Sequence, residues 1–596
     1  MKRKLGLLIT TLLFSFTLTS CFLNNPSTPD SPEEPGTDEP DTPSNPDKPS
    51  TPDTPSNPDK PSTPDTPSNP DKPSIPDTPS NPDKPSTPDT PEVLDGYFFD
   101  GNVAIDGDGT IEKPYNNLSY IKTLDLNSKH HIYLKRNSKF KGSIELSNIS
   151  GTDDDNILIT SYGDGDLPKI DGNNKVGSAV VALTNCSNIT ISNLEIFDSS
   201  TVEGDRRGVL VLANNPNNET KIVTYSNITL DGLYIHDING ITDKENSGMS
   251  ADSKKTGGIH FGSSDGKAKF DNFTIKNCKI KDVSNVGIAS WYKFGSTSTK
   301  VSPYLANFKD TAYTNVIIEN NDISFIGKNA IFVRNLLGGL VRNNVVYETA
   351  IKCISGNSIV TSYVDGTIIE YNEGYYNRAV AKADGKIQDG CMLDADLQSK
   401  NTIWQYNYSH DNSFGLFLNC TSYSEKNKIE DDVIVRYNLS VNDKGTYGII
   451  YINYSAKMIQ VYNNTIVTGS DTSVIFQTNS GTNSQFYNNL IYNRSKNATF
   501  KVNASSNADI SNNLVYSDEN GAITNMSSFK SLNYNGIYEN PLFIKDLPIN
   551  SICGIDAAKY YKIASNSIVY DSALDVANVN DFFGNKYKNA IGFYCG

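Results

Sequence analysis

The sequence predicts an all-β fold, a right-handed parallel β-helix wound from short coils with loop insertions, over residues 95–596. Three observations predict it: short β-branched runs recur, each run is followed by Asn, and the spacing between these Asn residues centres on one value. Their successive separations are 43, 23, 29, 35, 31, 25, 25 and 24 residues, so a repeat of 23 to 25 residues carries longer insertions in its loops. The marker residues are Asn277, Asn320, Asn343, Asn372, Asn407, Asn438, Asn463, Asn488 and Asn512.

The repeated runs are four to seven residues long and rich in Ile, Val, Tyr and Phe, which favours strands over helices. Asn accepts left-handed backbone geometry, so Asn residues stacked at equivalent corners can bond from one coil to the next. One coil cannot bury its apolar face alone, and only stacking builds the core. A β-sandwich, the alternative, would need regular Gly-containing turns, which are scarce here.

Residues 1–20 are predicted to be a secretory signal peptide, because basic MKRK precedes an apolar run and small residues follow it. The segment LTSC, ending at Cys21, resembles the bacterial lipoprotein signal. That resemblance implies lipidation of Cys21 and a membrane-anchored protein at the cell surface or in the periplasm. An uncleaved anchor and plain secretion are the alternatives.

Residues 21–94 are predicted to be a disordered linker that begins at the lipid anchor. The segment PSNPDKPSTPDT recurs every 12 residues, and Pro at this density excludes helices and sheet ladders. In a polyproline conformation, at ~3.1 Å per residue, the linker would reach roughly 200 Å at most. It would therefore hold the β-helix clear of the membrane surface.

The net charge of −16, without a basic stripe, argues against a nucleic-acid partner. The seven cysteines after Cys21 show no CxxC pair and no metal-finger spacing, so most are expected to act as small buried hydrophobes. One disulfide, between Cys553 and Cys595, is considered. We expect a monomer that needs no cofactor.

The two ends of the repeat region resemble a known superfamily. DGDGTIEKPYNNLSYI, HIYLKRNSKFKGSI and ILITSYGDGDLPKIDG look like the opening of pectate-lyase-like β-helix proteins, a superfamily of polysaccharide lyases and glycoside hydrolases. ENPLF, YKIASNSIVYDSALD and DFFGNKYKNAIGFY look like their ending. The resemblance covers roughly residues 97–596 and implies a sugar-active β-helix, without separating lyase from hydrolase.

The candidate site is the stretch DGCMLDADLQSKNTIWQYNYSHDN, residues 389–412. In CMLDADL the alternation of side chains sends the Leu and Ala residues inward, so Asp394 and Asp396 project together from the outer face, with Cα atoms about 6.5 to 7 Å apart. Asp389 lies in the preceding turn. His410 and Asp411 are expected to serve packing or corner bonding rather than catalysis.

Alignment of the neighbouring strands predicts two outer columns beside the aspartates. The first holds His260, Phe332, Lys352, Asp394, Phe417 and Tyr451, and the second holds Trp291, Arg334, Asp396, Asn419, Asn453 and Gln477. Cations, rings and amides on an outer face fit a sugar-binding groove. The predicted substrate-binding residues are Lys352, Arg334, Trp291, His260, Asn419, Tyr451 and Asn453. A register error of one residue would turn half of these inward.

Three functions remain open. A glycoside hydrolase, the preferred interpretation, would use two carboxyls of different pKa from Asp389, Asp394 and Asp396, with retaining or inverting stereochemistry undecided. A polysaccharide lyase would bind Ca²⁺ through the same aspartates and use Lys352 or Arg334 as base. Calcium-dependent lyases of the superfamily carry denser Asp motifs, so the lyase is second. A non-catalytic glycan-binding adhesin is the third.

Overall fold

The structure is a computed structural model that describes residues 94–126, 130–218, 220–242, 256–292, 308–382, 385–387, 389–420, 432–454, 458–576, 579–586 and 588–596. The predicted signal peptide, Cys21 and the predicted linker, apart from its last residue, lie outside the described residues. Asp95–Gly596 belong to one compact unit. Within the described residues, no helix has the length and apolar character needed to cross a membrane.

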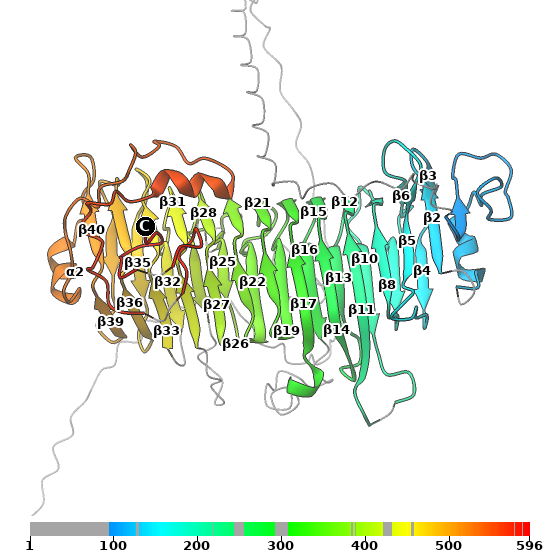
Figure 1. The fold of residues 1–596 in the computed structure, drawn as a ribbon, viewed down its shortest axis with the longest axis horizontal. Coiled ribbons are helices and arrows are strands. Elements are labelled where there is room, and N and C mark those ends of the chain that lie inside the picture. Colours follow the sequence, from blue (N-terminus) through cyan, green and yellow to red (C-terminus); the bar gives the residue numbers. More distant parts are fainter. Residues whose placement is uncertain are drawn as a thin grey trace, which may run out of the picture. The chain divides into compact units, whose positions relative to one another are not determined.

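The predicted right-handed parallel β-helix is confirmed. Each complete coil contributes strands to three rows, and equivalent strands of successive coils pair in parallel within each row (Figure 1).

Row 1 consists of β4 (Ile144–Ser147), β7 (Val181–Thr184), β10 (Arg207–Ala213), β13 (Gly257–Ser263), β16 (Val286–Tyr292), β19 (Ile331–Leu337), β22 (Ile359–Asp365), β25 (Leu393–Ala395), β26 (Ser399–Lys400), β29 (Phe417–Cys420), β32 (Ile450–Tyr454), β35 (Val474–Thr478) and β38 (Thr499–Lys501). Row 2 consists of β1 (Tyr97–Phe99), β2 (His131–Lys135), β5 (Ile157–Tyr162), β8 (Ile189–Ser192), β11 (Val223–Asp231), β14 (Ala268–Lys276), β17 (Tyr313–Glu319), β20 (Leu340–Arg342), β23 (Ile368–Glu370), β27 (Thr402–Gln405), β30 (Val433–Arg436), β33 (Met458–Tyr462), β36 (Asn483–Tyr487) and β39 (Asn507–Ser511). Row 3 consists of β3 (Lys139–Lys141), β6 (Lys169–Asp171), β9 (Glu195–Asp198), β12 (Tyr234–Ile238), β15 (Lys279–Val283), β18 (Asp322–Ile326), β21 (Val345–Thr349), β24 (Glu373–Tyr375), β28 (Tyr408–His410), β31 (Leu439–Val441), β34 (Thr465–Val467), β37 (Leu490–Asn493) and β40 (Leu514–Ser517).

The core is a set of stacked apolar columns. In row 2 the register places one inward-facing apolar side chain of each coil on that of the next. This column is Ile132, Ile159, Ile191, Leu230, Ile275, Ile318, Val341, Ile369, Trp404, Val435, Val461, Phe486 and Ile510, all within one buried cluster. Stacking therefore supplies the apolar burial that a single coil lacks.

The predicted Asn corner divides into two adjacent positions between rows 2 and 3. The first position has a left-handed backbone, as in Asn320 (φ 57°) and Asn343 (φ 53°). The second position holds a buried Asn whose side chain bonds its counterpart on the next coil, so that Asn321 Nδ2 donates to Asn344 Oδ1 at 2.9 Å. The ladder continues through Asn372, Asn407, Asn438, Asn464, Asn489, Asn513 and Asn533. The prediction that the same Asn adopts the left-handed backbone and bonds the next coil was wrong, because adjacent residues have these two roles.

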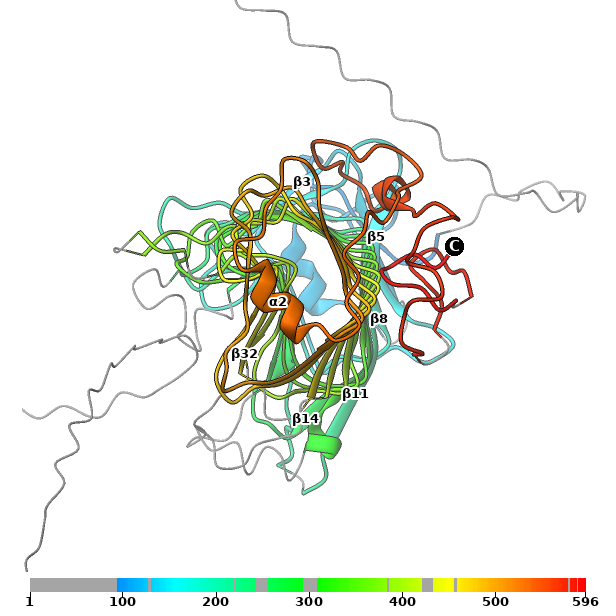
Figure 2. The same cartoon turned by 90° about the vertical axis from the view of Figure 1, so that its left-hand side faces the viewer.

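The chain after the last coil, residues 539–576, 579–586 and 588–596, is called the C-terminal segment. It folds back along the outside of this corner (Figure 2). Where Tyr replaces Asn at the left-handed position, the rings of Tyr371 and Tyr406 stack with centroids 4.9 Å apart, and both contact Phe582. Further along, Asn463 Nδ2 donates to Ala590 O at 2.7 Å. The C-terminal segment is thus held by the corner residues themselves.

Short helices close both ends of the core. Near the first coils, the 3₁₀-helix η1 (Leu118–Thr123) buries Leu118 and Ile121. Beyond the last coils, α2 (Met526–Leu532) places Phe529 on Phe500, with ring centroids 3.6 Å apart. Such caps cover the apolar interior that the terminal coils of a solenoid would otherwise expose. A second 3₁₀-helix, η3 (Ile555–Tyr561), belongs to the C-terminal segment.

The considered disulfide between Cys553 and Cys595 is wrong, since both thiols are free. Cys595 is buried among aromatic residues of the C-terminal segment, including Phe582 and Phe593. Cys553 is exposed and lies against β24 and β28 instead.

Candidate functional site

The three aspartates lie where row 3 turns into row 1. Asp389 is in the turn between β24 and β25, Asp394 is on β25, and Asp396 follows that strand. The predicted alternation holds within β25, where Leu393 and Ala395 belong to the core cluster and Asp394 pairs with Val360, which lies outside that cluster. It ends after the strand, because Leu397, which was also predicted to face inward, lies in a turn and outside the core cluster. Asp394 and Asp396 are each only 7% exposed, so neighbouring residues cover them more than is expected for side chains in an open groove.

Asn357, in the turn before β22, fixes the acidic stretch from the preceding coil. Its Oδ1 accepts hydrogen bonds from the backbone N–H groups of Gly390 at 3.0 Å and Cys391 at 2.8 Å. Its Nδ2 donates to Asp394 Oδ2 at 2.8 Å. One side chain therefore positions both the turn that carries Asp389 and the carboxylate of Asp394.

The surroundings of Asp389 alter its acidity. Burial raises the pKa of the Asp389 carboxyl above its usual range; a hydrogen bond from Gly356 N–H and the positive charge of Lys328 oppose that rise, and the negative charge of Asp396 adds to it. The Gly356 N–H lies 3.0 Å from Asp389 Oδ2. Asp389 and Asp396 thus interact electrostatically, and the negative charge of Asp396 helps to hold the pKa of Asp389 above its usual range.

Gly356 is required by its surroundings. Its φ is +149°, and a Cβ at this position would lie 2.9 Å from Lys328 O. Asn357, Gly356 and Lys328 were not predicted from the sequence, because all three lie in turns whose sequences follow no strand periodicity.

The first predicted outer column is partly correct. The register of row 1 joins His260, Phe332, Asp394 and Tyr451 into one column, as predicted. Lys352 is not in it, because the strand of that coil is β22 and Val360 takes the place. Lys352 instead lies in the turn after β21, where its Nζ donates to Ser284 Oγ at 3.3 Å.

A one-residue register error affects the strand FGLFLNC. Leu418, not Phe417, pairs with Asp394, and Phe417 is in the core. Asn419 consequently pairs with Ala395 on the inner face, is fully buried, and donates from Nδ2 to Ala395 O at 3.2 Å. The predicted roles of Phe417 as an outer-face residue and Asn419 as a sugar ligand are therefore wrong.

The second predicted column is displaced in its later coils. Gln477 pairs with Tyr451, not with Asn453. Asn453 Oδ1 accepts a hydrogen bond from Tyr451 Oη at 2.9 Å, so its amide takes part in an internal contact. The backbone of Trp291 pairs with Gly262, and its side chain lies outside the described residues.

Arg334 is 4% exposed, and its guanidinium lies over two rings, 5.3 Å from the centroid of Phe332 and 5.2 Å from that of Tyr363. Because Phe332 shares the column of Asp394, this cation lies on the face of the candidate site. Of the predicted substrate-binding set, Arg334, His260 and Tyr451 thus keep their predicted face.

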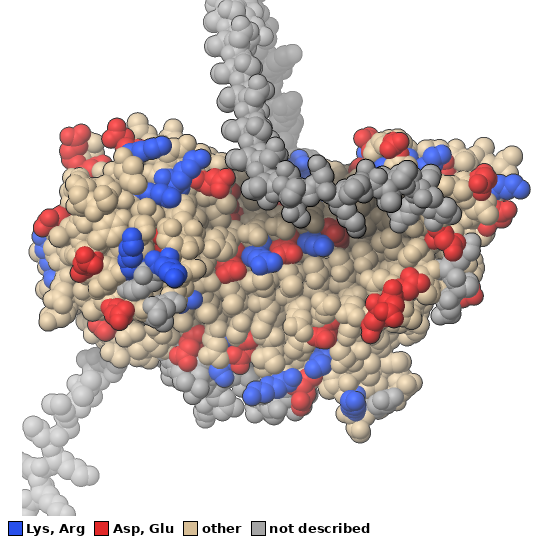
Figure 3. Space-filling view, viewed as in Figure 1, with Lys and Arg blue, Asp and Glu red and all other residues tan. Residues whose placement is uncertain are grey.

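A cavity of about 820 Å³ lies at the same corner on the following coils. It is lined by the turns after β24, β28, β31, β34, β37 and β40 and by part of the C-terminal segment: Tyr376, Asn377, Arg378, Asp411, Ser413, Asn442, Lys444, Gly469, Ser470, Asp471, Tyr492, Arg494, Asp518, Asn520, Leu547, Ile549 and Asn550. A Cβ on Gly390 would meet Arg378 Cα at 3.0 Å and, closer still, Ser413 Oγ, so the cavity wall touches the residue after Asp389. Basic and acidic side chains are interspersed on the face drawn in Figure 3.

The chain matches no protein family model. A lacto-N-biosidase from Bifidobacterium longum subsp. longum is 27% identical over 476 residues, and the match covers 65% of this chain and 28% of that protein. The chain thus spans little more than a quarter of that relative's length.

Two crystal structures of GH136 lacto-N-biosidase from Eubacterium ramulus are also similar. The selenomethionine derivative is 24% identical with a TM-score of 0.50, covering 64% of this chain and 65% of that one. The native protein is 22% identical with a TM-score of 0.51, covering 68% of each chain. These likenesses show the fold, a right-handed parallel β-helix.

Proposed function

We propose that the β-helix unit is a glycoside hydrolase in which Asp389 and Asp396 react with the glycan and Asp394 positions them. The observation that carries the proposal is the pKa of Asp389, which is raised by burial and by the negative charge of Asp396. Glycoside hydrolysis needs two carboxyls, one that donates a proton and one that is ionised, and a raised pKa suits Asp389 to the first of these roles. The similarity to lacto-N-biosidases supports the same reaction class.

In this mechanism Asp389 donates its proton to the glycosidic oxygen as the bond to the leaving group breaks. The carboxylate of Asp396 either attacks the anomeric carbon or activates a water that does so. Asp394, held by Asn357, keeps the strand that leads to Asp396 in place. Of the three aspartates from which the sequence predicts a catalytic pair, this proposal assigns the reaction to Asp389 and Asp396.

The first substrates to test are lacto-N-biosides, as the names of the relatives indicate. The unit from Asp95 onward should release a reducing sugar from one of a panel that also holds plant, algal, mucin and glycosaminoglycan polymers. A product that absorbs in the ultraviolet, with activity lost on chelation of Ca²⁺, would replace the proposal with the lyase. Binding of a glycan without release of any product would replace the proposal with a non-catalytic adhesin.

The charge of Lys328 should set the upper pH limit of activity. Since a positive charge stabilises the ionised carboxyl, Lys328→Met is expected to raise the pKa of Asp389 and to move the alkaline limb of kcat/KM upward by about one pH unit. Lys328→Arg keeps the charge and serves as the control. An alkaline limb that stays fixed in Lys328→Met would assign the proton donor to another group.

We also propose that this enzyme is attached to a membrane through lipid on Cys21 and the linker of residues 21–94, as the sequence predicts. In cells, Cys21→Ala is expected to leave the membrane fraction and to lose labelling by a fatty-acid analogue. Retention of the label in that variant would contradict the assignment.

A further inference from the structure

Glu373, His410 and Cys553 converge from three separate elements. Glu373 opens β24, His410 ends β28 on the next coil, and Cys553 belongs to the C-terminal segment. One ligand atom from each, a carboxylate oxygen, an imidazole nitrogen and a thiol sulfur, lies within 4.8 Å of the other two. His410 is fully buried and Glu373 is 3% exposed, whereas Cys553 is the exposed member, so solvent reaches the cluster at the sulfur.

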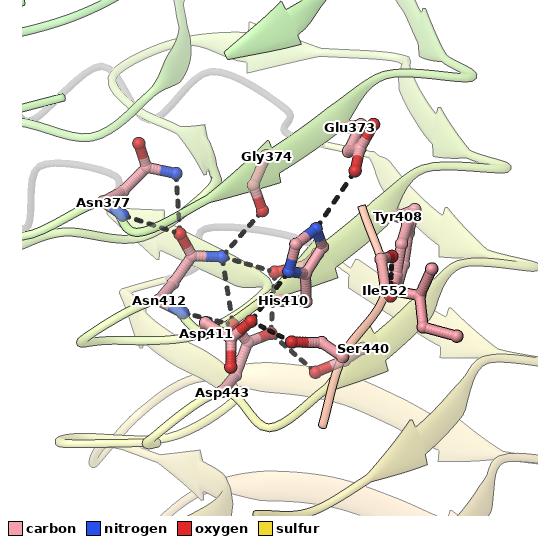
Figure 4. A network of polar contacts seen from close by, with 12 residues as sticks. Glu373, Gly374, Asn377, Tyr408, His410, Asp411, Asn412, Ser440, Asp443 and Ile552 are labelled. Atoms are coloured by element: carbon pink, nitrogen blue, oxygen red, sulfur yellow. Dashed lines mark hydrogen bonds and ion pairs between the residues drawn. The ribbon is translucent and has the colours of Figure 1, made fainter. Parts of the chain in front are cut away.

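The imidazole of His410 is oriented through its other nitrogen. Nε2 lies 3.1 Å from Glu373 Oε1, and Nδ1 lies 2.9 Å from Asp411 Oδ2, on the opposite side of the ring (Figure 4). The rings of Tyr375 and Tyr408 flank it, with centroids 4.7 and 4.6 Å away. A carboxylate that accepts from Nδ1 while Nε2 faces other donor atoms is the arrangement that commonly supports metal-bound histidines.

The spacing of the donor atoms fits a tetrahedral ion. Bonds of ~2.0 Å to nitrogen and oxygen imply an N···O separation of about 3.3 Å, and a bond of ~2.3 Å to sulfur implies about 3.6 Å between sulfur and either atom. The observed N···O separation of 3.1 Å is close to the first value. Since the donor atoms lie within 4.8 Å of one another, the sulfur has to move inward by about 1.2 Å at most, which an exposed residue on a peripheral segment permits.

We propose that Glu373, His410 and Cys553 form a Zn²⁺ site with one open coordination position. Imidazole, thiolate and carboxylate together favour zinc over the hard cations, which prefer all-oxygen sets. The carboxylates of Glu373 and Asp411 add negative charge around the ion. Binding displaces a proton from Cys553 and, where His410 is protonated, a second proton from Nε2, so binding weakens as the pH falls.

The ion would fasten the C-terminal segment to the coils. This segment already contacts the same place, because Gly554 N–H donates to Glu373 Oε1 at 2.6 Å and Tyr408 Oη donates to Ile552 O at 3.0 Å. An ion bound by Cys553, by Glu373 on one coil and by His410 on the next would hold this part of the C-terminal segment against both coils. The site is separate from Asp389, Asp394 and Asp396, so it requires nothing of the proposed hydrolase.

The test is metal binding by the unit from Asp95 to Gly596. Zinc is expected to bind at one equivalent in competition with a chromophoric chelator, and Co²⁺ in its place should give a thiolate charge-transfer band in the near ultraviolet. Zinc should also slow alkylation of Cys553 by iodoacetamide and slow proteolysis of the C-terminal segment. Cys186→Ala, which removes a buried thiol of an early coil, should change none of these results.

Cys553→Ser is expected to weaken zinc binding at least about tenfold and to abolish the cobalt band, and Asp411→Asn to weaken binding about 10- to 100-fold while keeping the band. Native protein that fails to bind zinc, or that binds it equally well after alkylation of Cys553, overturns the proposal. The alkylation experiment uses folded wild-type protein, so it tests the proposal even if one of the variants folds poorly.

Discussion

Replacing Asp389 by Asn is expected to lower kcat on a natural glycan about 10²- to 10⁴-fold, because the amide cannot donate the proton that the leaving oxygen needs. On an aryl glycoside, whose leaving group needs little protonation, the loss should be much smaller. Asp396→Asn should remove activity on both substrates, since it takes away the attacking or water-activating carboxylate. Asp394→Asn, which keeps an oxygen to accept from Asn357 Nδ2, is the matched control and should retain most activity.

The same Asp389→Asn variant should be more stable than the wild type at neutral pH. A carboxyl whose pKa is raised in the folded state gives its full contribution to stability below its unfolded pKa, near 3.8, and loses it as the pH rises through the folded pKa. Asn stays neutral throughout, so the Tm difference should favour the variant at pH 7 and shrink towards pH 3.5. Equal kcat for Asp389→Asn and wild type, or a Tm deficit at pH 7, would assign Asp389 a purely structural role.

The fold was predictable because its signals are local. Short strands, their alternation and the recurring Asn are properties of about 24 consecutive residues, and they repeat often enough to outweigh exceptions. The identity of the reacting pair was less predictable, since the environment of Asp389 depends on turns of the preceding coils. Gly356 and Lys328, which act on Asp389, precede it by 33 and 61 residues.

The register errors have two different causes. In FGLFLNC both Phe417 and Leu418 are apolar, so alternation alone does not decide which of them faces the core. The run AIKCISG, with Lys352, reads as a strand although that coil uses β22, because an insertion length cannot be deduced from apolar periodicity.

The contacts of the C-terminal segment with the coils could not be predicted, because the residues that meet are far apart in the sequence. Cys553 meets Glu373 across 180 positions of the chain, and no periodic pattern links the two. The considered pairing with Cys595 placed the Cys553 thiol in the wrong environment.

The amide ladder should be the most sensitive feature for stability, and Asn407 lies near its middle. Asn407 Nδ2 donates to Ile369 O and to Asn438 Oδ1, each at 3.0 Å, and its Oδ1 accepts from Asn372 N–H and Nδ2, also at 3.0 Å. Asn407→Ala removes all four bonds and leaves their partners buried. With about 1–3 kcal/mol for each buried polar group left without a bond, partly relieved by relaxation, the expected loss of unfolding free energy is about 3–5 kcal/mol.

Because the coils of a solenoid contact only their neighbours, this loss should be concentrated around β24, β28 and β31 rather than spread evenly. Hydrogen exchange should show amides of these strands losing protection in Asn407→Ala, while β8 and β11 keep theirs. Asn520→Ala, at an exposed turn, removes an amide outside the ladder and should leave exchange unchanged. Uniform loss of protection along all three rows would instead mean that the β-helix unfolds as one cooperative unit, in which the ladder acts on the whole stack.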